Sequence, residues 1–180
     1  FLLNTSCSME SDENKIGIVI HGGAGTILKE NMTPELENSY IIKLEEAVMA
    51  GYDILKNGGS SKDAVEQAIR VMEDSPLFNA GVGAVLTNDE RVSLDASFMD
   101  GKNLNAGAIA GSSYIKNPIS AAIAVMDKSP HVLLSSKGAD DFAIGMGIDT
   151  VPNSYFITER RLNSVRRAKE NDKLTYVDPF

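Results

Sequence analysis

The chain has 180 residues, of which 43% are hydrophobic. This is enough to bury one substantial core, and one domain is therefore expected. Its formal charge of -8 offers no basic surface for a phosphate backbone, which argues against a nucleic-acid-binding protein. The one cysteine, Cys7, excludes a disulfide within the chain and a zinc site built from cysteines. No apolar run is long enough to cross a bilayer.

Residues 1–15 begin without Met and join a short apolar stretch to an acidic one. This pattern fits either a disordered leader or the remnant of a secretory or lipoprotein signal, in which Cys7 would carry the lipid. The first alternative places the protein in the cytoplasm, and the second places it in the periplasm or envelope.

Residues 16–20, with the sequence Ile-Gly-Ile-Val-Ile, are typical of a strand buried on both faces. The glycine-rich sequence His-Gly-Gly-Ala-Gly follows at residues 21–25. Residues 33–57 predict a helix, because Thr-Pro supplies a cap and a first turn, apolar residues recur at helical spacing, and Gly-Gly ends the pattern. A second helix is predicted over residues 60–72, capped by serine. We expect these two helices to form an antiparallel pair that covers a sheet.

Residues 75–83, with the sequence Ser-Pro-Leu-Phe-Asn-Ala-Gly-Val-Gly, predict a loop held in one shape. Pro76 fixes its own φ, while Gly81 and Gly83 permit backbone angles or close approaches that a Cβ would forbid. Asn79 is an amide that no core requires. It either holds the loop by bonding nearby backbone or contributes to a site.

Beyond this loop the sequence predicts short elements of an antiparallel sheet with helices outside it, rather than βαβ units. They are a hairpin with strands at 84–86 and 91–94, a strand at 105–111, a helix at 117–126, a strand at 131–134 and a helix at 138–146. The charged stretch that follows predicts a surface helix running into a flexible linker. The chain is therefore divided into a leader at 1–15, a domain at 16–157, and the helix and linker at 158–180.

Several segments, in order, resemble the plant-type L-asparaginase and isoaspartyl peptidase family of N-terminal nucleophile hydrolases. They are residues 21–25, 75–83, 94–101 and 105–111, with Asn-Pro at 117–118 and Ser-Pro-His-Val at 129–132. The resemblance runs from about residue 17 to residue 161. It implies an α+β fold, a four-layer αββα sandwich completed by a β chain from the same precursor, and an (αβ)2 heterotetramer.

The chain itself offers no complete nucleophile system, since its histidines are His21 and His131 and no serine has a base beside it in sequence. In the family, the precursor cleaves itself, and the threonine that begins the β chain is the nucleophile. Its own α-amine, with a pKa of about 7.7 to 8.0, acts as the base. This chain ends before any Gly-Thr-Val-Gly junction and so resembles the α chain alone. The resemblance implies no cofactor for catalysis.

The resemblance assigns supporting catalytic roles to Gly22 and Asn79. Gly22 resembles the position whose carbonyl contacts the threonine amine and whose peptide switches during autocleavage; an ordinary turn is the alternative. Asn79 resembles the amide that orients a water or the nucleophile region. The resemblance also implies a structural sodium ion held by six main-chain carbonyls. These belong to Met72, Glu73, Ser75, Phe78, Ala80 and Val82.

The resemblance thus implies an amidohydrolase that releases L-aspartate from β-aspartyl dipeptides and ammonia from L-asparagine. Glycosylasparaginase and threonine aspartase are alternatives within the same fold. A nucleotide-binding module built on residues 16–25 is a more distant one, and no G-x-G-x-x-G motif supports it. Asp95 and Asp100 are interpreted as core and turn residues rather than as a catalytic pair. One departure occurs at residues 136–140, Ser-Lys-Gly-Ala-Asp, where Gly-Glu-Gly-Ala-Glu is expected.

Overall fold

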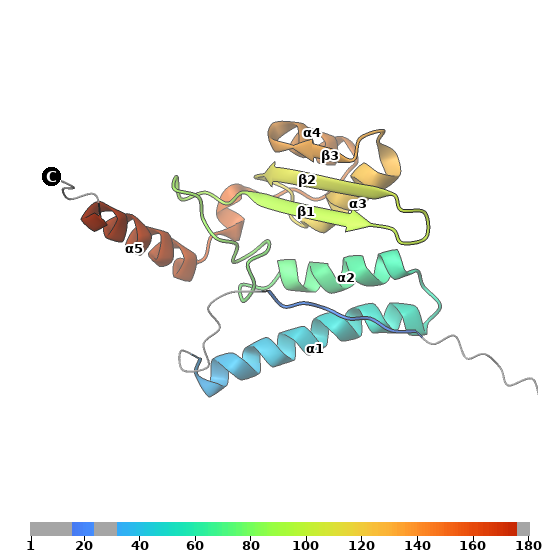
Figure 1. Cartoon of the computed structure of the whole chain (residues 1–180), viewed down its shortest axis with the longest axis horizontal. Coiled ribbons are helices and arrows are strands. Elements are labelled where there is room, and N and C mark those ends of the chain that lie inside the picture. Colours follow the sequence, from blue (N-terminus) through green and yellow to red (C-terminus); the bar gives the residue numbers. More distant parts are fainter. Residues whose placement is uncertain (1–15, 24–31, 176–180) are drawn as a thin grey trace, which may run out of the picture.

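The computed structural model describes residues 16–23 and 32–175 (Figure 1). The expected leader, the last part of the expected linker at 176–180 and the second half of the glycine-rich sequence, residues 24–25, lie outside the described residues.

Two helices form an antiparallel pair, as predicted, but the prediction that this pair covers a sheet is wrong, since neither helix contacts a strand of the described chain. Helix α1 spans Pro34–Lys56, and the Thr33 hydroxyl accepts a hydrogen bond from the third residue of the helix at 3.2 Å. Helix α2 spans Ser61–Glu73 and is capped in the same way by Ser60. Each cap satisfies a backbone N–H that has no partner within its helix, so both starting points follow from local sequence.

The strand predicted at residues 16–20 is absent. The segment pairs with no strand of the described chain, and the Val19 side chain is 95% exposed. The segment runs alongside α1, where Ile18 packs at Gly51 (Figure 1). A β-branched run forms a strand only when a neighbouring strand takes its backbone hydrogen bonds, and none is present here. The absence of this strand also removes the βα turn that a nucleotide-binding module would need.

The sheet consists of β1 (Leu94–Met99), β2 (Ala106–Ser112) and β3 (Leu133–Ser135), in that order. Strands β1 and β2 are antiparallel, as predicted, but β2 and β3 are parallel. The prediction that no βαβ unit occurs is therefore wrong. Helix α3 (Pro118–Lys128) packs on the sheet and returns the chain to the end at which β2 begins. Strand β3 therefore runs in the same direction as β2.

The predicted hairpin before β1 is reduced to one bridge between Leu86 and Val92. The side chain of Asn153 makes backbone hydrogen bonds to Val92 of the kind that a paired strand would make. The Asn153 amide accepts a hydrogen bond from the Val92 N–H at 3.0 Å and donates to the Val92 carbonyl at 2.8 Å. Asn153 opens a short 3-10 helix, Asn153–Phe156, whose buried Phe156 packs in the same apolar cluster as Val92.

One face of the sheet is covered by α3 and by α4 (Ser136–Gly145). The main apolar core lies between these two helices and the sheet. It is formed by Ile109, Ile115, Ala121, Val125, Ala139 and Ala143. A Cβ on Gly107 of β2 would collide with the backbone of α3, so this glycine allows the helix to pack closely on the strand.

The opposite face of the sheet has no covering layer within the described residues. The side chains of Asp95, Ser97 and Met99 are exposed on β1, and Met99 is 60% exposed. The structure is therefore a mixed α+β fold with helices on one side of the sheet.

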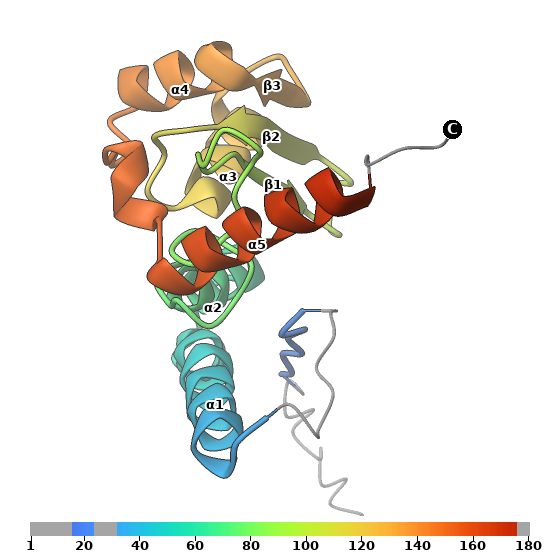
Figure 2. The same ribbon diagram turned by 90° about the vertical axis from the view of Figure 1, so that its left-hand side faces the viewer.

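The last helix, α5 (Glu159–Thr175), crosses the loops that follow α2 (Figure 2). None of the helices in the described part of the chain has the length and apolarity that a membrane span requires.

Candidate active-site loop

The loop of residues 75–83 has the constrained shape that its sequence predicts. Gly81 and Gly83 have φ of +47° and +95°, a region that residues with a Cβ rarely adopt. A Cβ at Gly81 would also collide with the backbone of Glu73, and one at Gly83 with the backbone of Pro76. Both glycines are therefore required by conformation and by close approach.

Helix α1 fixes one side of this loop. The Tyr40 hydroxyl donates a hydrogen bond to the Leu77 carbonyl at 2.9 Å. The same ring meets Phe78 edge to face, with ring centroids 5.8 Å apart. Since Phe78 is buried, the loop is anchored by an apolar side chain and by a hydrogen bond to its neighbour.

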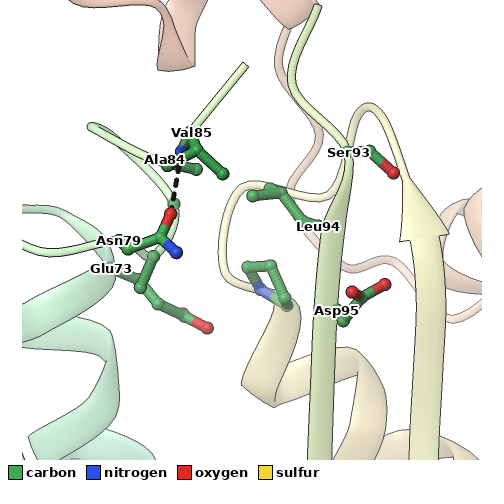
Figure 3. Close-up of a pocket in the computed structure, with 10 residues that line it drawn as sticks. Glu73, Asn79, Ala84, Val85, Ser93, Leu94 and Asp95 are labelled. Atoms are coloured by element: carbon green, nitrogen blue, oxygen red, sulfur yellow. Dashed lines mark hydrogen bonds between the residues drawn. The ribbon is translucent and has the colours of Figure 1, made fainter. Parts of the chain in front are cut away.

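Asn79 has the local role that its sequence left open, and it also faces a cavity. Its side-chain oxygen accepts a hydrogen bond from the Val85 N–H at 2.8 Å. The side-chain nitrogen points into a cavity of about 310 Å³ (Figure 3). The cavity is lined by Glu73, Asn79, Ala80, Gly81, Ala84, Val85, Ser93, Leu94, Asp95 and Pro118. Because its oxygen is already engaged, Asn79 presents two N–H donors to this space.

Glu73 also lines this cavity (Figure 3). It is 3% exposed, and its Oε1 accepts a hydrogen bond from the Ile119 N–H at 3.0 Å, which caps the first turn of α3. Within the described residues, the buried Oε2 has no hydrogen-bond partner. Burial raises the pKa of Glu73 to about 7, against the opposing effect of the Ile119 hydrogen bond.

The family resemblance implies a role for the carbonyl of Glu73 alone, and its side chain was not among the residues predicted from the sequence. One signal was present: Glu73 is the last residue of α2, where the helix dipole disfavours a carboxylate. An acid in that position suggests that its side chain has a partner elsewhere, here the N-terminus of α3.

The carbonyls of the loop differ in whether a protein donor binds them, and this difference bears on the predicted sodium ion. Four carbonyls outside the predicted set accept hydrogen bonds from protein donors: Pro76, Leu77, Gly81 and Gly83. Within the described chain, no protein donor reaches four of the six predicted carbonyls, those of Ser75, Phe78, Ala80 and Val82, nor that of Asn79. The other two, of Met72 and Glu73, accept bonds from the Ser75 and Val82 amides and keep a second lone pair.

The loop therefore fits a hard cation that binds weakly to neutral oxygens. A site made of acidic or imidazole side chains is not an alternative in residues 16–23 and 32–175, since no group of three or more potential side-chain ligands occurs there.

Gly22 lies apart from the cavity that Asn79 lines. It is half-buried against α1, and a Cβ there would come within 2.9 Å of the Leu44 side chain. The next residue, Gly23, has φ of +114°, and its N–H donates to the His21 ring at 3.2 Å. His21 is exposed, and the segment before it is not the buried strand predicted from the sequence.

Asp100 has the turn role predicted for it, whereas Asp95 is exposed on β1 and is not the core residue that was predicted. The Asp95 carboxylate accepts a hydrogen bond from the Gly111 N–H at 2.8 Å and so ties β1 to β2. The Asp100 carboxylate accepts one from the Lys102 N–H at 2.9 Å and closes a turn.

Comparison with known proteins identifies the family. A family model described as Asparaginase matches residues 14–179. The chain belongs to this asparaginase family. The resemblance seen in the glycine-rich sequence and in the loop of residues 75–83 is thereby confirmed.

The relatives of this asparaginase-family chain carry related names. It is 46% identical to an isoaspartyl peptidase of Salmonella typhimurium, over 87% of the chain and 50% of the relative. It is 49% identical to a plant-type L-asparaginase of Pyrococcus horikoshii, over 86% of the chain and 48% of the relative. An isoaspartyl peptidase/L-asparaginase of Xenopus laevis is 46% identical over 86% of the chain and 48% of the relative. The chain spans about half the length of these curated relatives.

Proposed function

We propose that this asparaginase-family chain is the α subunit of a hydrolase that releases L-aspartate from β-aspartyl dipeptides and ammonia from L-asparagine. The relatives' names support this substrate class. The structural observation that carries the proposal is the Asn79 amide. Its oxygen is bound by Val85, and its N–H groups face the cavity, where they can orient a water or a reacting group.

The nucleophile in this proposal is the N-terminal threonine of a second chain. Ser93 carries the one hydroxyl among the side chains that line the cavity in the described structure, and it has no hydrogen bond to a base there. Neither His21 nor His131 lines the cavity. An N-terminal threonine supplies a nucleophile and, through its own amine, a base in the same residue, so the cavity needs neither histidine.

Two unpaired surfaces support a second chain that completes a four-layer αββα sandwich. One is the bare face of the sheet, with Met99 at 60% exposure. The other is the extended segment at 16–20, whose apolar Val19 side chain is 95% exposed and whose backbone pairs with no strand of the described chain. A partner sheet would bury the first and pair with the second. The proposed α and β chains come from one precursor and assemble as (αβ)2, as the family resemblance implies.

The sodium ion belongs to this proposal as a structural group. The carbonyls of the loop would hold it, and its contribution would be to fix the loop that carries Asn79. No catalytic cofactor is proposed.

The test begins with the full-length product of the gene that encodes this chain. The expected result is spontaneous cleavage into two fragments, with threonine at the N-terminus of the second. The cleaved protein is then assayed with β-aspartyl-leucine, L-asparagine and a glycosylated asparagine, and turnover of the first two is expected. Turnover of the glycosylated substrate alone, or a second fragment that begins without a hydroxyl or thiol, would contradict the proposal.

A further inference from the structure

Helix α5 binds the backbone of the loop that carries Asn79. The Arg161 guanidinium donates from Nε to the Gly83 carbonyl at 2.5 Å, and Arg160 donates to the Pro76 carbonyl at 3.1 Å. Partial burial lowers the pKa of Arg161, and the neighbouring positive charge of Arg160 lowers it further. A partly dehydrated guanidinium on a carbonyl makes a charge-assisted hydrogen bond, which is stronger than one between neutral groups.

Gly83 is held from both sides by the C-terminal part of the chain. Its N–H donates to the carbonyl of the fully buried Phe156 at 3.1 Å, and its own carbonyl accepts from Arg161. Gly83 also has φ of +95°, and a Cβ there would collide with Pro76. Its position is therefore fixed by the segment from Phe156 to Arg161 rather than by a regular strand.

Gly83 lies two residues before Val85, whose N–H holds the Asn79 oxygen at 2.8 Å. We propose, resting on the function proposed above, that Arg161 is a positioning residue for Asn79. It holds Gly83, which sets the position of the Val85 N–H, and this N–H directs the Asn79 nitrogen into the cavity. Arg161 is not among the residues that line this cavity and acts only through the loop.

The middle of α5 provides a matched control. Arg166 and Lys169 donate to the carboxylate of Glu90 at 3.2 and 3.3 Å, in the turn that follows the loop. Arg166→Met and Arg161→Met remove the same charge and the same side chain from one helix. Of these two arginines, only Arg161 touches the backbone of the Asn79 loop.

The first measurement is independent of activity. In the full-length protein, amide hydrogen exchange is followed in the peptide that contains Val85. Arg161→Met is expected to make this exchange about tenfold faster, because the local opening that exposes the amide becomes easier. Arg166→Met is expected to leave it unchanged. Equal exchange in the two variants would overturn the inference even if the enzyme is active.

The second measurement is a double-mutant cycle of Arg161→Met and Asn79→Ala, read as kcat for L-asparagine. Alone, Arg161→Met is expected to lower kcat about 10- to 100-fold with KM unchanged, since a misplaced group costs rate without contacting substrate. In the Asn79→Ala background it is expected to have almost no further effect. Additive losses would overturn the inference. Should Arg161→Met fold poorly, Arg161→Lys takes its place in the cycle under the same expectation of non-additivity.

The two measurements separate the inference from the proposed function. A wild-type protein with no activity toward asparagine or β-aspartyl dipeptides would contradict the proposed function, and the exchange of Val85 would still decide the role of Arg161 in the loop.

Discussion

The side-chain oxygen of Asn79 accepts a 2.8 Å hydrogen bond from the Val85 N–H, so the two ends of this amide have different tasks. The oxygen stabilises the loop, and the nitrogen faces the cavity. The local role of Asn79 and its proposed functional role are therefore compatible, because each uses a different atom.

Asn79→Asp is expected to separate the two tasks. Aspartate keeps an oxygen for Val85 and removes both N–H donors, and the position is exposed, so a charge is tolerated. We expect stability to change by less than about 1 kcal/mol. By contrast, kcat for L-asparagine is expected to fall about 100-fold, as when a single positioned donor is removed from an active site.

Asn79→Ala is the companion variant. It removes both ends of the amide and is expected to lose about 1 kcal/mol of stability in addition to the same loss of kcat. Urea unfolding and steady-state kinetics measure the two effects. An aspartate variant as active as the wild type would show that the nitrogen has no part in the reaction.

Glu73 provides a second prediction, from the contact that joins α2 to α3. Glu73→Ala removes the acceptor of the Ile119 N–H and leaves a buried donor unpaired, so a loss of about 2 kcal/mol is expected. Glu73→Gln keeps an oxygen for Ile119 and removes a charge that burial disfavours. It is expected to lie within about 1 kcal/mol of the wild type. Denaturant unfolding of both variants tests this, and equal losses would show that the charge itself is required.

The attachment of α5 to Glu90 predicts a dependence on pH. Hydrogen bonds from Arg166 and then Lys169 lower the pKa of Glu90 from its ordinary value of 4.5. A carboxylate with a lowered pKa in the folded state stabilises the protein above its unfolded pKa, and this stabilisation is lost as the pH falls through the folded value. The wild type is therefore expected to unfold at a higher temperature than Glu90→Gln at pH 7, with the difference shrinking as the pH falls below 4.5 and through the lowered pKa of the folded state.

Since Arg166 is exposed and Glu90 and Lys169 are partly exposed, the difference is also expected to shrink in 1 M salt, where the Debye length is about 3 Å. Thermal unfolding across pH and salt measures both trends. A difference that grows on acidification would contradict the assigned direction.

Local signals in the sequence predicted the helices and the loop. The features that the sequence did not predict depend on contacts between residues that are distant in the chain. Thr33 and the proline after it determine where α1 begins, and Gly81 and Gly83 determine the loop, because each acts through its own backbone. The segment at 16–20 has the composition of a strand, but a strand also needs a neighbour, which local sequence does not supply.

The sequence also did not predict the direction of β3 or the buried contact of the Glu73 side chain. The composition of β3 does not show that it runs parallel to β2, since this depends on how α3 packs against the sheet. The hydrogen bond from Ile119 to Glu73 joins residues 46 positions apart, and no spacing rule connects them. Of the candidate site, the sequence identified Asn79 and its loop, whereas the cavity and the carboxyl of Glu73 became visible only in three dimensions.

Ser136 is the position where the sequence departs from the glycine expected for the family, and the structure shows the consequence. Ser136 has φ of +50° at the junction of β3 and α4, a left-handed conformation that costs a residue with a Cβ about 1 to 2 kcal/mol. Ser136→Gly is therefore expected to stabilise the protein by about 1 kcal/mol, after allowance for the greater freedom of glycine in the unfolded chain. Ser135→Gly is the matched control: Ser135 has φ of -136°, where glycine brings no relief, and a loss of about 0.5 to 1 kcal/mol is expected. Urea unfolding midpoints compare the two, and a loss of stability in Ser136→Gly would show that the serine side chain contributes more than the backbone strain costs.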